Sequence, residues 1–246
     1  MRPRIGASSE QERRAMVSLD HRLEAYRQLR GSGLEIGALH EPAPLPKGVE
    51  ARYFDALSEQ QAAALFPEID ATRFVHVDFI GDLDRKGLSQ FPPSTFDFVV
   101  INHVLEHLAN PVSAVAEVFR IVRPGGHVVL SIPDKRYTFD RNRKETSFDH
   151  LWSDFEIGTE ESSDEHYIDF LRSAAPHVFM EPPENLAHHV SRCRVRREHA
   201  HVWTSATFRA FLDGVFARLG LRTLCLYESR GESNQIEYFS LWLKSD

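Results

Sequence analysis

Residues 96–132 read FDFVVINHVLEHLANPVSAVAEVFRIVRPGGHVVLSI, and this stretch decides the fold. Phe96 to Ile101 is a nearly continuous apolar run, which suits a parallel strand buried on both faces. Asn110 and Pro111 then supply an N-cap and a first-turn proline for a helix whose valines share one face. Val128 to Ile132 forms the next strand. The stretch therefore predicts a strand–helix–strand unit of a parallel sheet.

The chain before this stretch alternates strands and helices in the same way. Met16 to Tyr26 repeats apolar residues at three- and four-residue steps, which predicts an amphipathic N-terminal helix. Strands are expected at 34–37, at 49–54 and at 74–77, the last closed by Asp78, with a helix at 58–66. This alternation predicts right-handed βαβ units and a parallel sheet.

The chain after Pro133 first loses its regular pattern and then recovers it. From Asp134 to about Glu198 the sequence is polar, and a polar stretch of this length is more often a functional lid than a plain loop. Thr204 or Ser205 then caps an amphipathic helix that ends before Gly220. Residues 221–227 and 236–243 form two last strands, and the short polar link between them suits an antiparallel pair.

These elements predict an α/β fold with a doubly wound, mostly parallel seven-stranded sheet. The sheet ends in a C-terminal antiparallel strand pair, and a polar lid insertion at about residues 135–198 follows the fifth strand. Residues 1–32 are expected to form a helical extension, and residues 33–246 the main domain.

The composition argues against several classes of protein. The 246 residues are 42% hydrophobic with a net charge of −7, which predicts one substantial core and repulsion from a phosphate backbone. We interpret the arginines at 192, 194, 196 and 197 as a solvated segment or an anchor for one anionic group, rather than a nucleic-acid groove. The sequence holds no apolar run of about eighteen residues, no secretory signal and only two cysteines. We therefore expect a cytoplasmic protein that binds neither nucleic acid nor membrane.

Glycines and polar residues stand where the predicted strands end. In a doubly wound sheet the ligand lies outside the carboxyl ends of the strands. Asp55 lies about twenty residues beyond the first glycine, the usual offset for an acid that binds ribose hydroxyls. The alternative is a lone acid that caps the next helix. The residues at the predicted strand ends are Gly37, Asp55, Asp78, Asn102–His103 and Pro133–Asp134.

Several motifs stand in the order seen in one enzyme superfamily. They are Glu35-Ile36-Gly37, Asp55, Val77-Asp78, the strand at 96–100, HVLEHL at 103–108 and RPGG at 123–126. In these motifs the sequence resembles the class I S-adenosylmethionine-dependent methyltransferases, and within them the methyltransferase type 11 branch. The resemblance covers about residues 33 to 135, and the last helix and two strands fit the same fold.

The resemblance implies S-adenosylmethionine (SAM) as the cofactor. The first loop departs from the family pattern because larger residues rather than further glycines follow Gly37. We therefore expect a wider loop in which His40 or Glu41 contacts the amino-acid end of the cofactor. By resemblance the cofactor-binding residues are Glu35, Gly37 and Ala38 in the first loop, Asp55 at the ribose, Asp78 and Phe79 at the adenine, and Asn102 and His103 near the methionine part.

Methyl transfer is an in-line displacement at a sulfonium methyl, so alignment alone can supply about 7–11 kcal/mol. A hydroxyl acceptor is also helped by a general base, and histidine suits that role. We interpret His107 or His201 as this base, with packing or hydrogen bonding as the competing role for each. Arg136, Tyr137 and His199 are expected to bind the acceptor.

The acceptor is expected to be a small molecule methylated at oxygen, such as a sugar, a glycan precursor or a secondary metabolite. The Asn-Pro-Pro-Tyr motif associated with methylation of base and amide nitrogens is missing after the fourth strand, where Asn-His-Val stands. A nicotinamide-dependent oxidoreductase is disfavoured because Gly37 opens no Gly-x-Gly-x-x-Gly turn. The alternative from another class is a catalytically silent relative that serves as a partner subunit. A homodimer is compatible with the sequence.

No metal site is expected. Some relatives use a divalent metal, which Glu106, His107 and a lid carboxylate could hold here. However, adjacent residues on a helix diverge by about 100°, so this pair is not expected to share an ion. His188 and His189, with Glu184, are interpreted as solvated surface residues.

Overall fold

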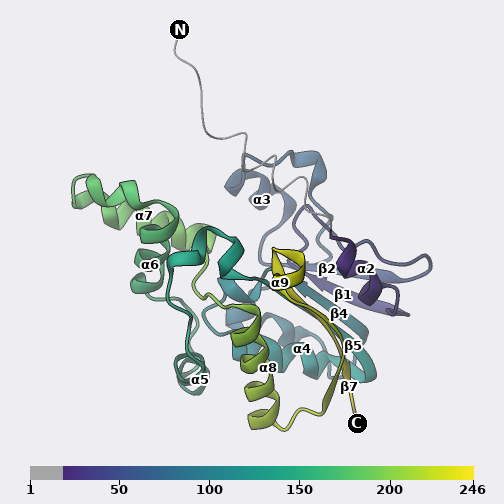
Figure 1. Cartoon of the computed structure of the whole chain (residues 1–246). Helices are drawn as coiled ribbons and strands as arrows, with labels where there is room; N and C mark the ends of the chain where they lie inside the picture. Colours follow the sequence, from purple (N-terminus) through teal and green to yellow (C-terminus); the bar gives the residue numbers. More distant parts are fainter. Residues whose placement is uncertain (1–18) are drawn as a thin grey trace.

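The structure is a computed structural model that describes residues 19–246, and its centre is a seven-stranded sheet (Figure 1). The strand order is β3-β2-β1-β4-β5-β7-β6. β1 to β5 run parallel, whereas β7 is antiparallel to both β5 and β6. The predicted fold class is therefore confirmed. The strands are β1 Ser32–Ile36, β2 Glu50–Asp55, β3 Phe79–Ile80, β4 Phe96–Asn102, β5 Val122–Pro133, β6 Thr223–Ser229 and β7 Glu237–Lys244.

The helices begin and end largely where capping residues predict. Asn110 accepts a hydrogen bond from the Ser113 amide at the start of α4, and Thr204 caps α8, which ends at Gly220 in a left-handed conformation. None of the helices within residues 19–246 is long and apolar enough to cross a membrane. The helices are α2 Asp20–Tyr26, α3 Glu59–Leu65, α4 Pro111–Ile121, α5 Phe148–Ile157, α6 Asp164–Ala174, α7 Glu184–Arg196, α8 Ser205–Leu219 and α9 Gly231–Asn234.

Side chains alternate along β4 and give the sheet two apolar faces. Val99 and Ile101 belong to the larger core, which α4 and α8 cover on one face (Figure 1). Phe98 and Val100 belong to a smaller core on the other face, where α2 contributes Tyr26. The continuous apolar sequence of this strand reflects burial on both sides.

The described part of the predicted N-terminal helix is α2. α2 begins at Asp20, and the predicted start at Met16 lies outside the described residues. Tyr26 of this helix is only 1% exposed. Its ring packs edge-on against the ring of Phe239 in β7, with 5.7 Å between the ring centroids. α2 therefore forms part of the domain's second core.

The third strand was predicted too early in the chain. Residues 74–77 are not a strand, and β3 begins at Phe79, after Asp78 rather than before it. Backbone groups of the predicted strand bond elsewhere: the Val77 amide donates to the Glu59 carboxylate and the Val75 amide to the Leu39 carbonyl. These bonds hold the segment away from β2, so pairing starts only near Asp78.

The insertion after β5 is helical rather than irregular. α5, α6 and α7 occupy most of it, and Figure 1 shows α6 and α7 standing to one side of the sheet. α6 and α7 share a small apolar core of their own that includes Phe170 and Val190. The few apolar residues of these helices pack in this local core and are separated by many charged residues. The sequence therefore showed no clear helical periodicity here.

Candidate active site

Gly37 marks the edge of the sheet at which the candidate site lies. It follows β1 with a φ of 70°, and a Cβ built on it would lie 2.5 Å from Cγ2 of Val104, just past β4. Glycine is thus required both by backbone conformation and by the close approach of the post-β4 loop. Ala38 then opens a turn in which its carbonyl accepts from the Glu41 amide at 2.8 Å.

Glu35 of β1 braces the first loop from inside. Its side chain is 3% exposed, and its two carboxylate oxygens accept from the Ala43 amide at 2.9 and 3.1 Å. Burial raises the pKa of Glu35 to about 7, against the lowering effects of the Ala43 amide and of Arg22. The residue therefore shapes the loop that was predicted to hold the cofactor.

The two predicted cofactor acids lie in different environments. Asp55 ends β2, is half-buried, and accepts from the Leu57 amide at 3.1 Å. Burial raises its pKa, more than the Leu57 and Ala56 amides lower it. Asp78 is exposed and accepts from the Tyr53 amide of β2 at 2.8 Å. Phe79, the next residue, begins β3 and pairs with Phe54 of β2.

Two acids that sequence reasoning missed follow β3 at this edge. Asp84 is 5% exposed and accepts from the amides of Ala109 and Asn110 at the start of α4. Asp82 receives the Arg197 guanidinium. A correct position for β3 would have pointed to both, because they are the first carboxylates past the strand.

Asn102 and His103 end β4 with their side chains already engaged. Asn102 donates to the Tyr26 hydroxyl at 3.0 Å and accepts from Ser131 at 2.9 Å. His103, which has a positive φ of 52°, lies 2.6 Å from the Glu237 carboxylate through Nε2. Both residues stand at the end of β4, as the sequence predicted. Their side chains connect β4 to Tyr26 of α2, to Ser131 of β5 and to Glu237 of β7.

Glu106, His107 and His199 meet just beyond His103. Oε1 of Glu106 lies 3.7 Å from Nε2 of His107, and the rings of His107 and His199 are 4.7 Å apart. The expectation that Glu106 and His107 diverge is wrong at the ends of their side chains, which converge although residues 105–107 form a 3₁₀ turn whose adjacent residues leave the backbone about 120° apart. Neither oxygen of Glu106, which is 2% exposed, has a hydrogen-bond partner among residues 19–246.

Burial governs the protonation of this cluster. It raises the pKa of Glu106, and it lowers the pKa of His107 to about 3, with His199 as the next contributor. His107 is therefore a neutral ring at physiological pH. Its Nδ1 donates to the Arg197 carbonyl at 2.5 Å, because a carbonyl can only accept.

His201 lies apart from His107. It is 1% exposed, and its ring faces His150 and His166 at centroid distances of 5.8 and 5.1 Å. Within the described part of the chain, neither of its ring nitrogens has a hydrogen-bond partner. Burial holds its pKa well below the usual value. The structure thus separates the two histidines predicted as bases and brings His199, predicted for the acceptor, to His107 instead.

The predicted acceptor residues Arg136 and Tyr137 lie after β5. The Arg136 guanidinium bonds Asp134 at 2.6 Å and Glu232 at 2.7 Å, and it stacks over the ring of Tyr137. Tyr137 is 40% exposed. Arg136 therefore already has two carboxylate partners, and Tyr137 offers the more accessible surface.

The basic cluster near the end of α7 binds carboxylates of this chain. Arg194 pairs with Asp164, Arg196 with Glu68, and Arg197 with Asp82. The second and third pairs join the helical insertion to segments that follow β2 and β3, whereas Asp164 belongs to α6 of the insertion itself. Together the pairs account for three of the four arginines without an external anionic group.

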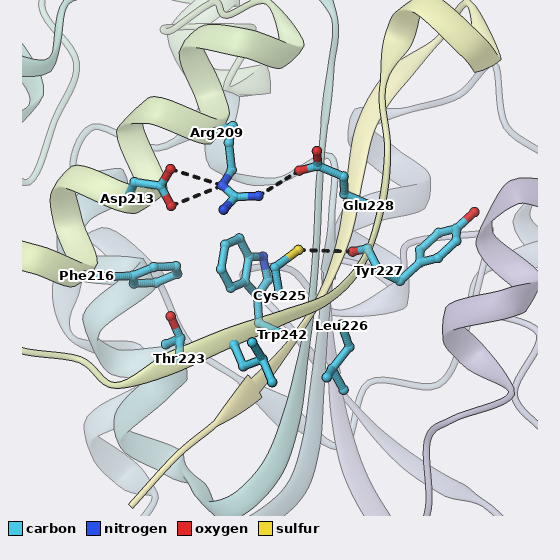
Figure 2. A pocket seen from close by; sticks show the side chains of 10 residues that line it. Arg209, Asp213, Phe216, Thr223, Cys225, Leu226, Tyr227, Glu228 and Trp242 are labelled. Carbon is cyan, nitrogen blue, oxygen red and sulfur yellow. Dashed lines mark hydrogen bonds and ion pairs between the residues drawn. The ribbon is translucent and has the colours of Figure 1, made fainter.

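A pocket of about 610 Å³ lies between α8 and the strands β6 and β7 (Figure 2). Arg209 and Asp213 of α8 face Glu228 of β6 across it, and Trp242 forms its floor. None of the predicted site residues lines this pocket. It is therefore separate from the candidate site.

Comparisons with known proteins agree with the fold and the motifs. The family described as "Methyltransferase domain" matches residues 9–215, most of the chain. Among solved structures, the PH0226 protein from Pyrococcus horikoshii OT3 superposes with a TM-score of 0.53 at 15% identity, covering 97% of this chain and 93% of that one. This likeness shows the fold alone.

Curated relatives align over shorter segments. A ubiquinone biosynthesis O-methyltransferase of Alkalilimnicola ehrlichii is 34% identical over 101 residues, which are 41% of this chain and 35% of that protein. An uncharacterized methyltransferase of Schizosaccharomyces pombe is 50% identical over 44 residues, 18% of this chain and 16% of that protein. The chain thus matches about a third or less of the length of these relatives. With the family match over residues 9–215, it belongs to the class I SAM-dependent methyltransferases.

Proposed function

We propose that this protein transfers the methyl group of SAM to an oxygen atom of a small-molecule acceptor. The observation that carries the proposal is the polar cluster of Glu106, His107 and His199 directly after β4, at the ligand-binding edge of the sheet. The relative from Alkalilimnicola ehrlichii is named as an O-methyltransferase, which supports oxygen as the methylated atom.

The residues at this edge fit the cofactor. A Cβ at Gly37 would meet Val104 at 2.5 Å, so this glycine lets the first loop and the loop after β4 approach each other closely at the edge where the methionine part would lie. Asp55 uses Oδ1 for the Leu57 amide, and Oδ2 can accept from ribose hydroxyls. When bound, SAM supplies an electrophilic methyl group on a sulfonium, and its leaving group is neutral.

The acceptor hydroxyl must lose a proton during the transfer. A carbon–oxygen bond forms while the carbon–sulfur bond breaks, and the electron pair of the broken bond goes to sulfur. His107 donates from Nδ1 to Arg197, so its Nε2 lone pair can accept a hydrogen bond from the hydroxyl. The Glu106 carboxylate, 3.7 Å from that nitrogen, is the next acceptor for the proton.

We further propose that residues 135–198 act as a lid. Arg196 and Arg197, at the end of α7, contact Glu68 and Asp82, which follow β2 and β3. The lid therefore rests on the segments predicted to surround the ribose and adenine. A cytoplasmic location and a homodimer stay predictions.

Product analysis tests the proposed function. The protein and SAM are incubated with matched phenols, sugar alcohols and amines, and products are located by mass spectrometry and NMR. We expect O-methyl products, with Glu106→Gln and His107→Ala lowering kcat by about a hundredfold and leaving SAM affinity unchanged. Methylation only at nitrogen or carbon would refute oxygen transfer. Tight SAM binding without any product would favour a silent partner subunit.

A further inference from the structure

We propose that Glu106, His107 and His199 bind a divalent transition-metal ion, with Zn²⁺ as the reference ion. Each of the three residues offers one ligand atom, and these atoms all lie within 4.8 Å of one another. Whether the ion binds does not depend on the proposed function, although its chemical role does.

The first argument is the buried carboxylate. Glu106 is 2% exposed, and within residues 19–246 neither of its oxygens finds a hydrogen-bond donor. Removing a carboxylate from water without a partner is costly, and buried charges are normally paired or coordinated to a metal. A cation between Glu106 and the two rings would compensate this charge.

The second argument is the hydrogen bonding behind both rings. Nδ1 of His107 lies 2.5 Å from the Arg197 carbonyl, and Nδ1 of His199 lies 2.6 Å from Oδ2 of Asp140. Carbonyl and carboxylate oxygens only accept, so both rings donate from Nδ1 and keep their lone pair on Nε2. Metal-binding histidines almost always show this arrangement, which fixes the tautomer and the ring orientation.

Asp140 is itself held in place for this role. It is 1% exposed, and its other oxygen accepts from Arg143 at 2.9 Å. Arg143 also donates to the carbonyls of His199 and Ala200. The segment that carries His199 is therefore held on the Nδ1 side of the ring, which leaves Nε2 to a ligand.

The third argument is the geometry and the donor set. Ligand atoms of a tetrahedral zinc site lie about 3.4 Å apart, given bonds of about 2.0–2.1 Å. The 3.7 Å between Oε1 of Glu106 and Nε2 of His107 is close to this value, and all three ligand atoms lie within 4.8 Å of one another. Two imidazoles and a carboxylate suit Zn²⁺, whereas Mg²⁺ prefers oxygen ligands.

An ion held in this way would have an open position. The His107 side chain is 30% exposed, so the cluster can be reached from solvent. Three protein ligands with one open position is the pattern of catalytic zinc sites. If the proposed function holds, a bound ion would take the Nε2 lone pair of His107 and replace it as the group that promotes deprotonation, since an acceptor hydroxyl in the open position would lose its proton more readily, as zinc-bound water does.

Calorimetric titration with Zn²⁺ tests the site in the full chain without SAM or acceptor. We expect one Zn²⁺ per chain, and a loss of affinity of more than about a hundredfold in Glu106→Gln and His199→Ala. Asp140→Asn, which keeps all three ligands, should weaken binding by about 10–100-fold. His150→Ala and His166→Ala are the matched controls, since they alter the neighbouring histidine cluster around His201 and should bind as the wild type does.

Co²⁺ provides a second readout, because its visible absorption reports on tetrahedral coordination by protein ligands. The wild type should show these bands, and His199→Ala should lack them while circular dichroism stays unchanged. Equal Zn²⁺ affinity in the wild type and both ligand variants, or a loss confined to His150→Ala and His166→Ala, would overturn the site. Zinc binding without methylated product would refute the proposed function alone. O-methylation by a chain that binds no Zn²⁺ would refute the site alone.

Discussion

Glu237 of β7 and His103, just past β4, lie 2.6 Å apart, although β5 separates their strands in the sheet. The Glu237 side chain is fully buried and also accepts from His21 at 2.6 Å and from Arg22 at 2.7 Å. Both of these residues belong to α2. One carboxylate thus fixes the N-terminal helix over the same edge of the sheet that carries the candidate active site.

Replacing Glu237 by Gln should destabilise the fold by about 3–5 kcal/mol near neutral pH, because buried cationic partners lose their counter-charge. Burial alone would raise the pKa of Glu237, but hydrogen bonds from His103 and His21 outweigh it and hold the pKa well below 4.5. A depressed pKa contributes stability above about pH 4.5 that is lost as the pH falls through the folded value. In urea unfolding, the difference in the free energy of unfolding between the wild type and Glu237→Gln should therefore decrease as the pH falls below about 4.5.

The matched control is Glu232→Gln, which removes an ion pair to Arg136 from a carboxylate that is 53% exposed. It should change stability by less than about 1 kcal/mol. Equal effects of the two substitutions would contradict the role assigned to Glu237.

Glu35→Gln should stabilise the cofactor-free protein at alkaline pH. The folded pKa of about 7 exceeds the usual 4.5, so the folded state keeps a proton that the unfolded state has lost. The contribution of Glu35 to the free energy of unfolding is therefore fully present below about pH 4.5, and it is lost as the pH rises to about 7. The charged or titratable groups around Glu35 are Arg22, Tyr26 and Tyr53.

In Glu35→Gln this slope should vanish, with a gain on the order of 1–3 kcal/mol at about pH 8. Chemical unfolding across the pH range measures it. Glu50→Gln, an exposed glutamate at the start of β2, is the control and should leave the slope intact. A wild-type slope retained in Glu35→Gln would contradict the prediction.

Gly37→Ala should destabilise the protein by about 1–3 kcal/mol, since a side chain at positive φ is strained and the new methyl meets Val104. Val104→Ala in the same chain should recover part of this loss, because it removes the methyl group at 2.5 Å but not the backbone strain. A double-mutant cycle of unfolding free energies measures the coupling. Strict additivity would mean that the two loops do not touch.

The sequence predicted the sheet well because its signals are local. The apolar run at 96–101 and the caps at Asn110 and Thr204 act within a few residues of themselves, and the structure has each in place. The third strand was misplaced because a distant carboxylate, Glu59, takes the amide of Val77. No local pattern reveals such a bond.

The candidate site was less predictable for the same reason. His107 was predicted, but its partner His199 lies 92 residues later in the chain. The segment that carries His199 reaches the cluster through backbone contacts: the Arg197 carbonyl bonds His107, and the Ala200 amide donates to the Glu106 carbonyl. The spacing rule for helices also failed at Glu106, because it describes where side chains leave the backbone, whereas the ends of the Glu106 and His107 side chains converge to 3.7 Å. Only the tertiary fold brings these three side chains together.

Asp55→Ala should weaken SAM binding about tenfold or more, because ribose hydroxyls would lose a buried acceptor worth about 1–3 kcal/mol. Asp78→Ala should change affinity by less than about threefold, since that exposed carboxylate already accepts from the Tyr53 amide and sits before β3. Calorimetry with SAM separates the two. The reverse order of effects would contradict the assignment of Asp55 to the ribose.

The helical insertion should exchange amide hydrogens faster than the sheet in the free protein. α6 and α7 pack on a small core of their own, and ion pairs such as Arg197–Asp82 and Arg85–Glu161 join them to the main domain. Partly exposed pairs of this kind contribute about 0–1 kcal/mol each, so local opening costs far less than global unfolding. Exchange in α6 and α7 should slow when the cofactor product and an acceptor are added together, and Arg197→Met should accelerate it without ligand. Val99 and Ile101 of β4 serve as the internal reference, since both are fully buried in the central sheet. Protection of α6 and α7 equal to that of β4 in the free protein would show a rigid extension of the core, and a lid would then have no part in the reaction.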